Sequence, residues 1–202
     1  MAGHEERSEA EASERYRRVR GYFVAWLLMA ALVGAIVIVL ASGGEGEESA
    51  GSFDDRFAAD YEGLADRRTE AGVPTMSEGG GSHFHAQLAV YTNGKQIEVP
   101  ANIGIDPAEP LELMAGLHTH DPSGTIHNEA GSNSTLGQFF AIWGVPFSRS
   151  RLGPYEAGGS KQVRMWVNGE PSEEFGDLAL EDGQEIVVAY GREDEDPSGL
   201  TP

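Results

Sequence analysis

Five of the six histidines in this chain lie within residues 83–127, as two pairs and a single residue. The pairs are His83-x-His85 and His118-x-His120, and the single residue is His127. Residues i and i+2 of a strand share a face, so each pair is expected to project two imidazoles to one side. Several imidazoles without sulfur suit Zn, Cu(II), Ni or non-haem Fe. The spacing therefore predicts a transition-metal site, with Zn or Cu most favoured. A pH-responsive or hydrogen-bonding cluster is the alternative, because imidazole titrates at about pH 6.5.

The turn that joins the second pair to His127 determines how these rings are expected to meet. Its sequence is Asp121-Pro122-Ser123-Gly124, and its residues suit a turn at every position. If its central Pro-Ser pair is a two-residue hairpin loop, His118 lies directly opposite His127, with Cβ atoms about 4.5–5.5 Å apart. A bulge at Gly124 would shift the register by one residue and turn His127 to the opposite face. We prefer the unbulged register because it separates the histidines from Ile126.

Polar side chains beside these histidines are candidates for supporting roles. In the unbulged register Thr125 and Glu129 share the histidine face, and Asp121 opens the turn. Such groups orient ligating imidazoles through outer hydrogen bonds, or supply oxygen ligands themselves. If the site catalyses a reaction, Glu129 is the first candidate for a general base and Asp121 the second.

Three classes of function are compatible with such a cluster. The first is metal binding without turnover, for which a saturated set of histidines fits storage, sensing or delivery of copper or zinc. The second is a metalloenzyme, because three histidines and a bound water supply the nucleophile of zinc hydratases and hydrolases. The third is a structural module without metal that binds a membrane or extracytoplasmic protein through a sheet edge. The residues leave open whether the protein is an enzyme.

The histidines require a framework of strands, which the apolar pattern predicts. Phe84, Leu88 and Val90 alternate with His83 and His85, as in a half-buried strand whose imidazoles face away from the core. The two histidine-bearing segments are then expected to face one shared cleft. Further strands are expected over 96–99 after an Asn93-Gly94 hairpin turn, on both sides of the 121–124 turn, over 163–167 and over 185–190.

Two helices are expected beside these strands. Residues 135–143 form one, capped by Asn133 or Ser134, and its apolar side is expected in the core. A longer helix is expected to start at Ser52, with Asp55 completing a capping box, and to stop at Gly72. The apolar side of the first helix comprises Leu136, Phe139, Phe140 and Trp143. The sum is an α+β domain of mainly antiparallel strands with one packed central helix.

An apolar stretch near the amino terminus predicts a membrane anchor. Residues 22–41, YFVAWLLMAALVGAIVIVLA, carry no charge and at helical rise cover about 30 Å, the thickness of a bilayer core. Four arginines between residues 15 and 20 precede it and glutamates follow it, which places the amino terminus in the cytoplasm. Val39-Leu40-Ala41 also fits a cleavage site, but the length favours an uncleaved single-pass anchor.

The resulting organisation has five parts. Residues 1–20 form a cytoplasmic tail, 21–41 the transmembrane anchor, 42–52 a linker, 53–191 the extracytoplasmic domain and 192–202 a disordered acidic tail. The chain has 33 acidic against 14 basic residues and a net charge of −19, which argues against nucleic acid as a partner. It has no cysteine, which excludes disulfides, thiolate ligands and cysteine nucleophiles.

Two resemblances extend this interpretation. Five segments carry the first resemblance, in this order: HFHAQLAVYTNG, VPANIGI, HTHDPSGTIHNE, TLGQFFAIWGV and WVNGE. Through them the chain resembles a group of membrane-anchored extracytoplasmic proteins of bacteria and archaea. That resemblance implies a fold and a histidine site but no reaction. The stretch VNGEPSEEFGDLALEDGQEIVVAYG resembles the carboxy-terminal half of a β-grasp domain, which implies a β-grasp-like fold.

A β-sandwich or cupin-like fold is the alternative. Residues 116–127 fit the second cupin motif, G-x5-P-x-G-x2-H. The first motif requires a glutamate four or five residues after His85, and Ala89 and Val90 stand there. The sequence therefore lacks the ligand glutamate of a cupin oxygenase.

Overall fold

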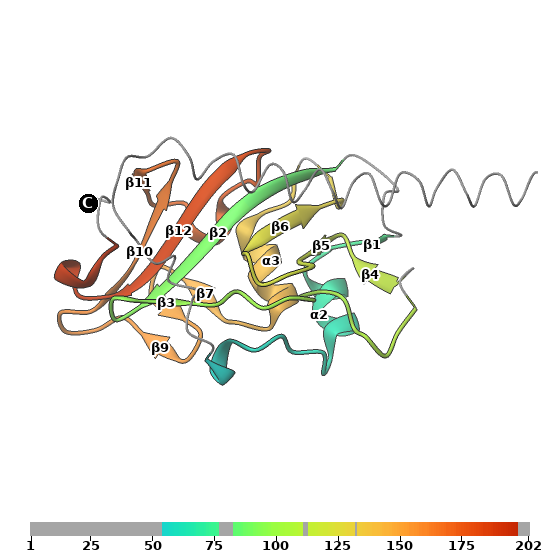
Figure 1. Ribbon diagram of the computed structural model, residues 1–202, viewed down its shortest axis with the longest axis horizontal. Coiled ribbons are helices and arrows are strands. Elements are labelled where there is room, and N and C mark those ends of the chain that lie inside the picture. The colour runs from blue at the N-terminus through green and yellow to red at the C-terminus, as the bar shows by residue number, and fades with distance from the viewer. Residues whose placement is uncertain (1–53, 77–82, 111–112, 132, 198–202) are drawn as a thin grey trace, which may run out of the picture. The chain divides into compact units, whose positions relative to one another are not determined.

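The computed structural model describes residues 54–76, 83–110, 113–131 and 133–197, which form an α+β fold (Figure 1). The main sheet has seven strands in the order β11-β10-β12-β2-β6-β5, with β3 also paired to β2. All of its pairings except β12 with β2 are antiparallel. Its strands are β2 (Phe84–Thr92), β3 (Lys95–Ile97), β5 (Leu117–His118), β6 (Thr125–Asn128), β10 (Gln162–Val167), β11 (Glu170–Ser172) and β12 (Gln184–Gly191).

Smaller elements surround this sheet. The described α-helices are α2 (Leu64–Glu70) and α3 (Leu136–Trp143). Short 3-10 turns are η2 (Asp55–Phe57), η4 (Phe175–Asp177) and η5 (Glu193–Glu195). Two small antiparallel sheets pair β1 (Thr75–Met76) with β4 (Met114–Ala115), and join β7 (Phe147–Ser148), β8 (Arg151–Leu152) and β9 (Tyr155–Glu156).

The two longest strands, β2 and β12, lie side by side and parallel in the middle of the sheet (Figure 1). The predicted alternation on β2 is confirmed, because Leu88 and Val90 are buried and Gln87 is exposed. Their partners on β12, Ile186 and Val188, are buried beside them. The same core contains the apolar residues of α3, which therefore packs on this face of the sheet.

Both Asn-Gly pairs form hairpin turns, so the turn predicted at Asn93-Gly94 is confirmed. The φ angles are 51° and 77° at Asn93-Gly94, and 53° and 83° at Asn168-Gly169. Two positive φ angles in succession are typical of the type I′ turn, whose twist matches that of the flanking strands. The strand after the first turn begins at Lys95 and ends at Ile97, so it is earlier and shorter than predicted.

The histidine hairpin has the predicted unbulged register, with His118 opposite His127. Its loop is longer than the two residues expected, because β5 ends at His118. Thr119 turns away: it exchanges hydrogen bonds with Ile103, and its hydroxyl donates one to the Pro100 carbonyl. Gly124 has a φ of +81° and its carbonyl accepts a hydrogen bond from the Leu88 N–H, which ties the loop to β2.

Helix α3 begins one residue later than expected. Its capping box consists of Thr135 and Gln138, each accepting a hydrogen bond from the other's backbone N–H. The prediction of Asn133 or Ser134 as the cap is wrong, because only Thr135 has a glutamine three residues ahead. The predicted apolar side is at most 1% exposed, so it belongs to the core; these residues are Leu136, Phe139, Phe140 and Trp143.

The continuous helix predicted from Ser52 to Gly72 is wrong in its described part. The turn η2 and the helix α2 are separated by residues 58–63, which are not helical. The Arg67 guanidinium donates hydrogen bonds to the carbonyls of Asp60 and Glu62, so these groups have side-chain partners in place of helical ones. Helix α2 does end near Gly72, which has a φ of +68°.

The predicted terminal segments are described only in part. Residues 1–52, assigned to the cytoplasmic tail, the anchor and the linker, lie outside the described residues. Within the described ranges, no helix has the length and apolar character needed to span a membrane. Residues 192–197, which the sequence assigns to a disordered tail, contain η5, and the Asp196 carboxylate pairs with both Nε and Nη2 of Arg164.

Candidate metal centre

Three neighbouring strands place three histidines in one row. Strand β6 pairs with β2 on one side and with β5 on the other. His127 of β6 therefore lies opposite His85 on β2 and opposite His118 on β5. The two histidine segments, which the sequence predicts to face one shared cleft, are neighbours in a single sheet and project their rings from the same face of it. The row places all three side chains on the face opposite to Leu88 and the core.

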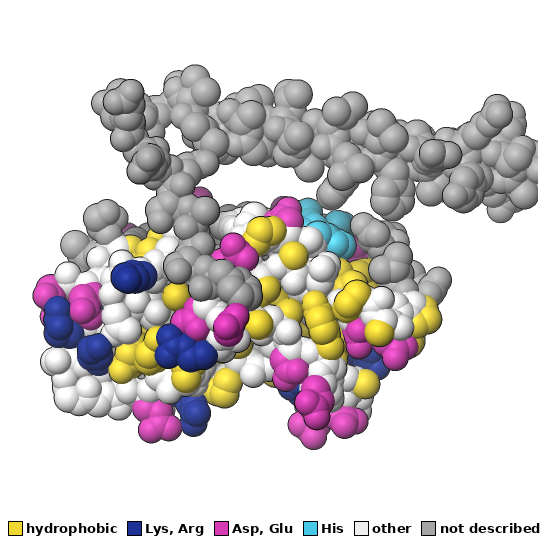
Figure 2. All heavy atoms as spheres, turned by 60° about the horizontal axis from the view of Figure 1, so that its bottom comes forward, with side chains coloured by type: hydrophobic (Ala, Val, Ile, Leu, Met, Phe, Trp, Pro, Cys, Tyr) yellow, Lys and Arg dark blue, Asp and Glu magenta, His cyan; other side chains and the backbone are white. Residues whose placement is uncertain are grey.

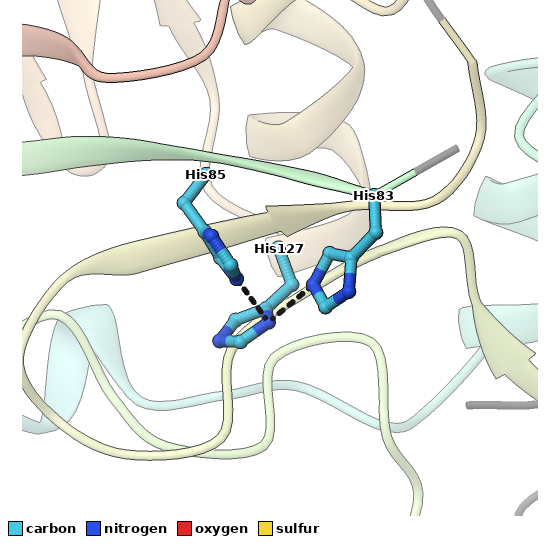
Figure 3. A group of neighbouring side chains, drawn as sticks. All are labelled: His83, His85 and His127. Atoms are coloured by element: carbon cyan, nitrogen blue, oxygen red, sulfur yellow. Dashed lines mark hydrogen bonds between the residues drawn. The ribbon is translucent and has the colours of Figure 1, made fainter. Parts of the chain in front are cut away.

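The rings from β2 and β6 converge on one nitrogen atom. The Nδ1 atom of His127 lies 3.1 Å from His85 Nε2 and 3.2 Å from His83 Nε2 (Figure 3). A ring nitrogen carries one hydrogen or one lone pair, so it makes only one good hydrogen bond in its plane. A tetrahedral zinc ion with Zn–N bonds of about 2.0–2.1 Å holds its ligand nitrogens about 3.3–3.4 Å apart. The separations of these three nitrogens are therefore close to those around a metal ion.

His118 is held in an orientation that suits a ligand. Its ring is fully buried, and its Nδ1 lies 2.9 Å from the carbonyl oxygen of Ala115. Because a carbonyl only accepts, Nδ1 carries the proton and Nε2 carries the lone pair. That Nε2 atom lies 3.2 Å from Nε2 of His120. Backbone hydrogen bonds of this type fix the tautomer of ligating histidines.

The five histidines form two overlapping sets of three, and His127 belongs to both. One set comprises His83, His85 and His127, and the other His118, His120 and His127. Within each set the candidate ligand atoms lie within 4.8 Å of one another. His83 and His120 are exposed, whereas the other three rings are buried or half-buried. The cluster therefore reaches the surface, where Figure 2 shows the histidines as one patch with acidic side chains nearby.

Burial and neighbouring imidazoles keep the rings of His85, His118 and His127 neutral. Burial, followed by the repulsion of His120, lowers the pKa of His118 to about 4. Burial and the four neighbouring histidines lower the pKa of His127 to about 3. Burial is the main cause that lowers the pKa of His85, and repulsion by His83 is the second. Neutral imidazole is the form that binds metal ions, so these rings are competent ligands at neutral pH.

The predicted supporting residues Glu129, Asp121 and Thr125 differ in the groups that they contact. The Glu129 side chain is 1% exposed, and its Oε1 lies 3.8 Å from Nδ1 of His83. That places it behind a candidate ligand, where a carboxylate orients the imidazole. Asp121 accepts a hydrogen bond from the Ser123 N–H, and Thr125 donates one to Gln87. These two contacts stabilise the turn and the strand pairing.

Sequence reasoning did not identify Asp182 as part of the site. Its Oδ1 accepts a hydrogen bond from the His85 N–H at 3.1 Å, and its charge acts to raise the pKa of His85 against the effect of burial. The N–H of the next residue, Gly183, donates to the His85 carbonyl. The sequence predicts a turn at 181–184, but its position beside His85 depends on the parallel pairing of β12 with β2.

Comparisons of the chain with family models, curated proteins and solved structures found no match. The function is therefore inferred from the geometry of the histidines.

Proposed function

We propose that this protein binds a transition metal, zinc or copper, through its histidine cluster at the outer surface of a membrane. The ligands are His83, His85, His118, His120 and His127. The observation that carries this proposal is the approach of two ring nitrogens to His127 Nδ1 at 3.1 and 3.2 Å. Hydrogen bonding accounts for one of these two contacts, whereas a shared metal ion accounts for both. Nickel and iron also accept a nitrogen-only ligand set.

The electrostatics around the cluster also support a bound cation. Glu129 places a carboxylate in a buried position next to His83. Opposite charges attract more strongly at a buried position than in water, so this carboxylate favours a divalent ion beside it. The chain as a whole carries a net charge of −19, which raises the local concentration of cations near its surface.

The strand order supports a β-grasp-like fold in preference to the β-sandwich or cupin-like alternative. Along the sheet the order β3-β2-β12-β10-β11 places the first and last long strands together, parallel and central. Strand β2 is flanked by its hairpin partner β3, and β12 by β10, which forms a hairpin with β11. Helix α3 lies in the chain between the β2-β3 and β10-β11 hairpins. A β-grasp domain has this arrangement. The histidine hairpin β5-β6 is then an addition that continues the sheet at β2.

The location follows from the sequence. Residues 21–41 anchor the chain as a single span, the arginines before them keep the amino terminus in the cytoplasm, and the metal-binding domain lies outside. The resemblance to membrane-anchored extracytoplasmic proteins supports the same location. Membrane or extracytoplasmic proteins are therefore the expected partners, and nucleic acid is not.

A metalloenzyme is the second candidate, and one observation favours it. Each set contributes three histidines, which leaves a tetrahedral ion one position for water or substrate, as in catalytic zinc sites. Hydrolysis, hydration and a cupin-like oxygenation are the candidate reactions. The burial of Glu129 behind His83 suits an orienting role better than that of a general base.

The metal content of the purified full-length chain, kept in detergent, tests the proposal. We expect zinc or copper to remain bound after desalting, and to be lost from a variant with His118→Ala, His120→Ala and His127→Ala. The matched control is Gln87→Ala, which alters the same face of β2 without removing an imidazole. If the folded wild-type chain retains no metal after incubation with either ion, the proposal fails and a protein-interaction role becomes the leading alternative.

A further inference from the structure

We propose that the cluster holds two metal ions and that His127 bridges them, which rests on the proposed function. Each ion has two further histidines: His83 and His85 for one, His118 and His120 for the other. His127 binds one ion through each ring nitrogen. Three features support two ions: the position of β6, the bonding capacity of an imidazole and the grouping of the five rings.

The position of β6 gives His127 two neighbours on each side. Strand β6 lies between β2 and β5, with His85 and His118 directly opposite His127. His83 is two residues before His85, and His120 is two residues after His118. Neighbouring strands lie about 4.7–4.9 Å apart, so the backbones of β2 and β5 are about 10 Å apart across β6. The two pairs therefore approach the ring of His127 from opposite sides.

The bonding of His127 assigns its nitrogens. Its Nδ1 lies 3.1 and 3.2 Å from the Nε2 atoms of His85 and His83, so an ion held by these three residues occupies the Nδ1 lone pair (Figure 3). A ring nitrogen has one lone pair and serves one ion. An ion held by His118 and His120 must therefore use Nε2 of His127. Binding at both nitrogens converts the ring to imidazolate, and its single N–H proton passes to solvent.

The grouping of the rings argues against a single ion with five ligands. The candidate ligand atoms form two sets of three that share only His127. In the second set, Ala115 fixes the His118 tautomer so that Nε2 carries the lone pair, and His120 Nε2 lies 3.2 Å away. The His118 ring also stacks on the His127 ring, with centroids 5.3 Å apart and planes 15° apart. Two such sets of three ligands fit two adjacent ions better than one ion with five ligands.

The ligand chemistry limits the ions to those that accept three nitrogens and no sulfur, with Cu(II) and Zn²⁺ the best candidates. Each set has one exposed histidine, His83 or His120, so each ion faces solvent at one position. Two copper ions, or one copper and one zinc, therefore fit the same site. Two Cu(II) ions joined by imidazolate are magnetically coupled, which provides a direct readout of the bridge.

The test counts copper in the full-length chain and measures its electron paramagnetic resonance. The chain is kept in detergent, carries His4→Ala to remove the sixth histidine, is stripped with a chelator, loaded with Cu(II) and desalted. We expect two copper ions per chain, and one in each of the variants His83→Ala/His85→Ala and His118→Ala/His120→Ala. The resonance signal per copper should be strong in both variants, and weak in the parent because of coupling. Circular dichroism checks that each variant is folded.

The other outcomes overturn the two-ion inference, the bridge by His127 or both proposals. One copper per parent chain overturns the two-ion inference but leaves the proposed function standing. Two coppers with the full signal of isolated ions overturn the bridge by His127. If the folded parent retains no copper after this loading, and no zinc after the same treatment with Zn²⁺, both proposals are overturned. A folded His127→Ala variant that still shows coupling between two coppers also contradicts the bridge.

Discussion

At the scale of single residues, His118 shows how the fold orients a candidate metal ligand. Its backbone partner Ala115 leaves Nε2 with the lone pair, and burial keeps the ring neutral. The sequence predicted that His118 meets His127, because the 121–124 turn sets that register. It did not predict that His85 joins the same row, since residues 85 and 127 are 42 positions apart and no local signal joins them.

The low pKa values of these rings predict how the metal-free protein responds to acid. The unfolded chain takes up protons at histidine below about pH 6.5, whereas folded His118 and His127 do so only near pKa values of about 4 and 3. These two histidines therefore contribute most to the free energy of unfolding above about pH 6.5. The contribution of His118 and His127 to the free energy of unfolding falls as the pH drops from about 6.5 towards their folded pKa values, and it levels off below those values.

Urea unfolding of the metal-free chain between pH 7 and pH 4 measures this effect. Replacement His118→Gln should reduce the slope of stability against pH by up to about 1.4 kcal/mol per pH unit, the value for one proton. Equal slopes for the folded variant and the wild type would show that His118 titrates normally in the folded protein.

The carboxylate behind His83 gives a second prediction at this scale. Glu129→Gln keeps the size of the side chain but removes the charge next to Nδ1 of His83. Loss of such an outer partner typically lowers metal affinity by about 10–100-fold. Competition with a zinc chelator measures the change. Asp121→Asn is the control, because Asp121 accepts its hydrogen bond from Ser123, and equal effects of the two substitutions would contradict the assignment.

At the scale of elements, local patterns predicted the parts that depend on neighbouring residues. The alternation on β2 and the apolar side of α3 were read correctly, because each is a property of a short segment. The parallel pairing of β2 with β12, and with it Asp182 beside His85, depends on segments about one hundred residues apart. The break between η2 and α2 was missed because the carbonyl partners come from Arg67.

Substitution of Gly124 tests whether contact with Leu88 holds the loop between β5 and β6 against β2. A Cβ atom at this position would lie 2.1 Å from the Leu88 carbonyl oxygen, and the φ of +81° already disfavours a side chain. We expect Gly124→Ala to lower the free energy of unfolding by more than about 2 kcal/mol, which exceeds the left-handed penalty alone.

The matched control is Gly169→Ala, at a φ of +83° with no neighbouring atom within 4 Å of the added Cβ. It should cost only about 1–2 kcal/mol, the penalty for the backbone conformation. Urea unfolding of both variants gives the comparison. If both lose the same stability, contact with Leu88 does not restrict the loop.

At the scale of the whole molecule, the sequence predicts a membrane anchor followed by an acidic domain. The α+β class and the mainly antiparallel sheet were predictable from strand spacing, turns and one capped helix. The anchor remains a prediction from residues 21–41. The histidine cluster depends on the local turn and on the complete sheet, because the turn brings His118 to His127 and the pairing of β2 with β6 adds His85.

X-ray absorption at the metal edge of the zinc-loaded full-length chain tests the central claim most directly. Histidine ligation predicts nitrogen at about 2.0–2.1 Å, with the outer-shell scattering of imidazole rings. Zinc held by carboxylates and water alone, with a spectrum unchanged in the folded His127→Ala variant, would contradict the account. Imidazole scattering that weakens in that variant would establish the histidines as the ligands.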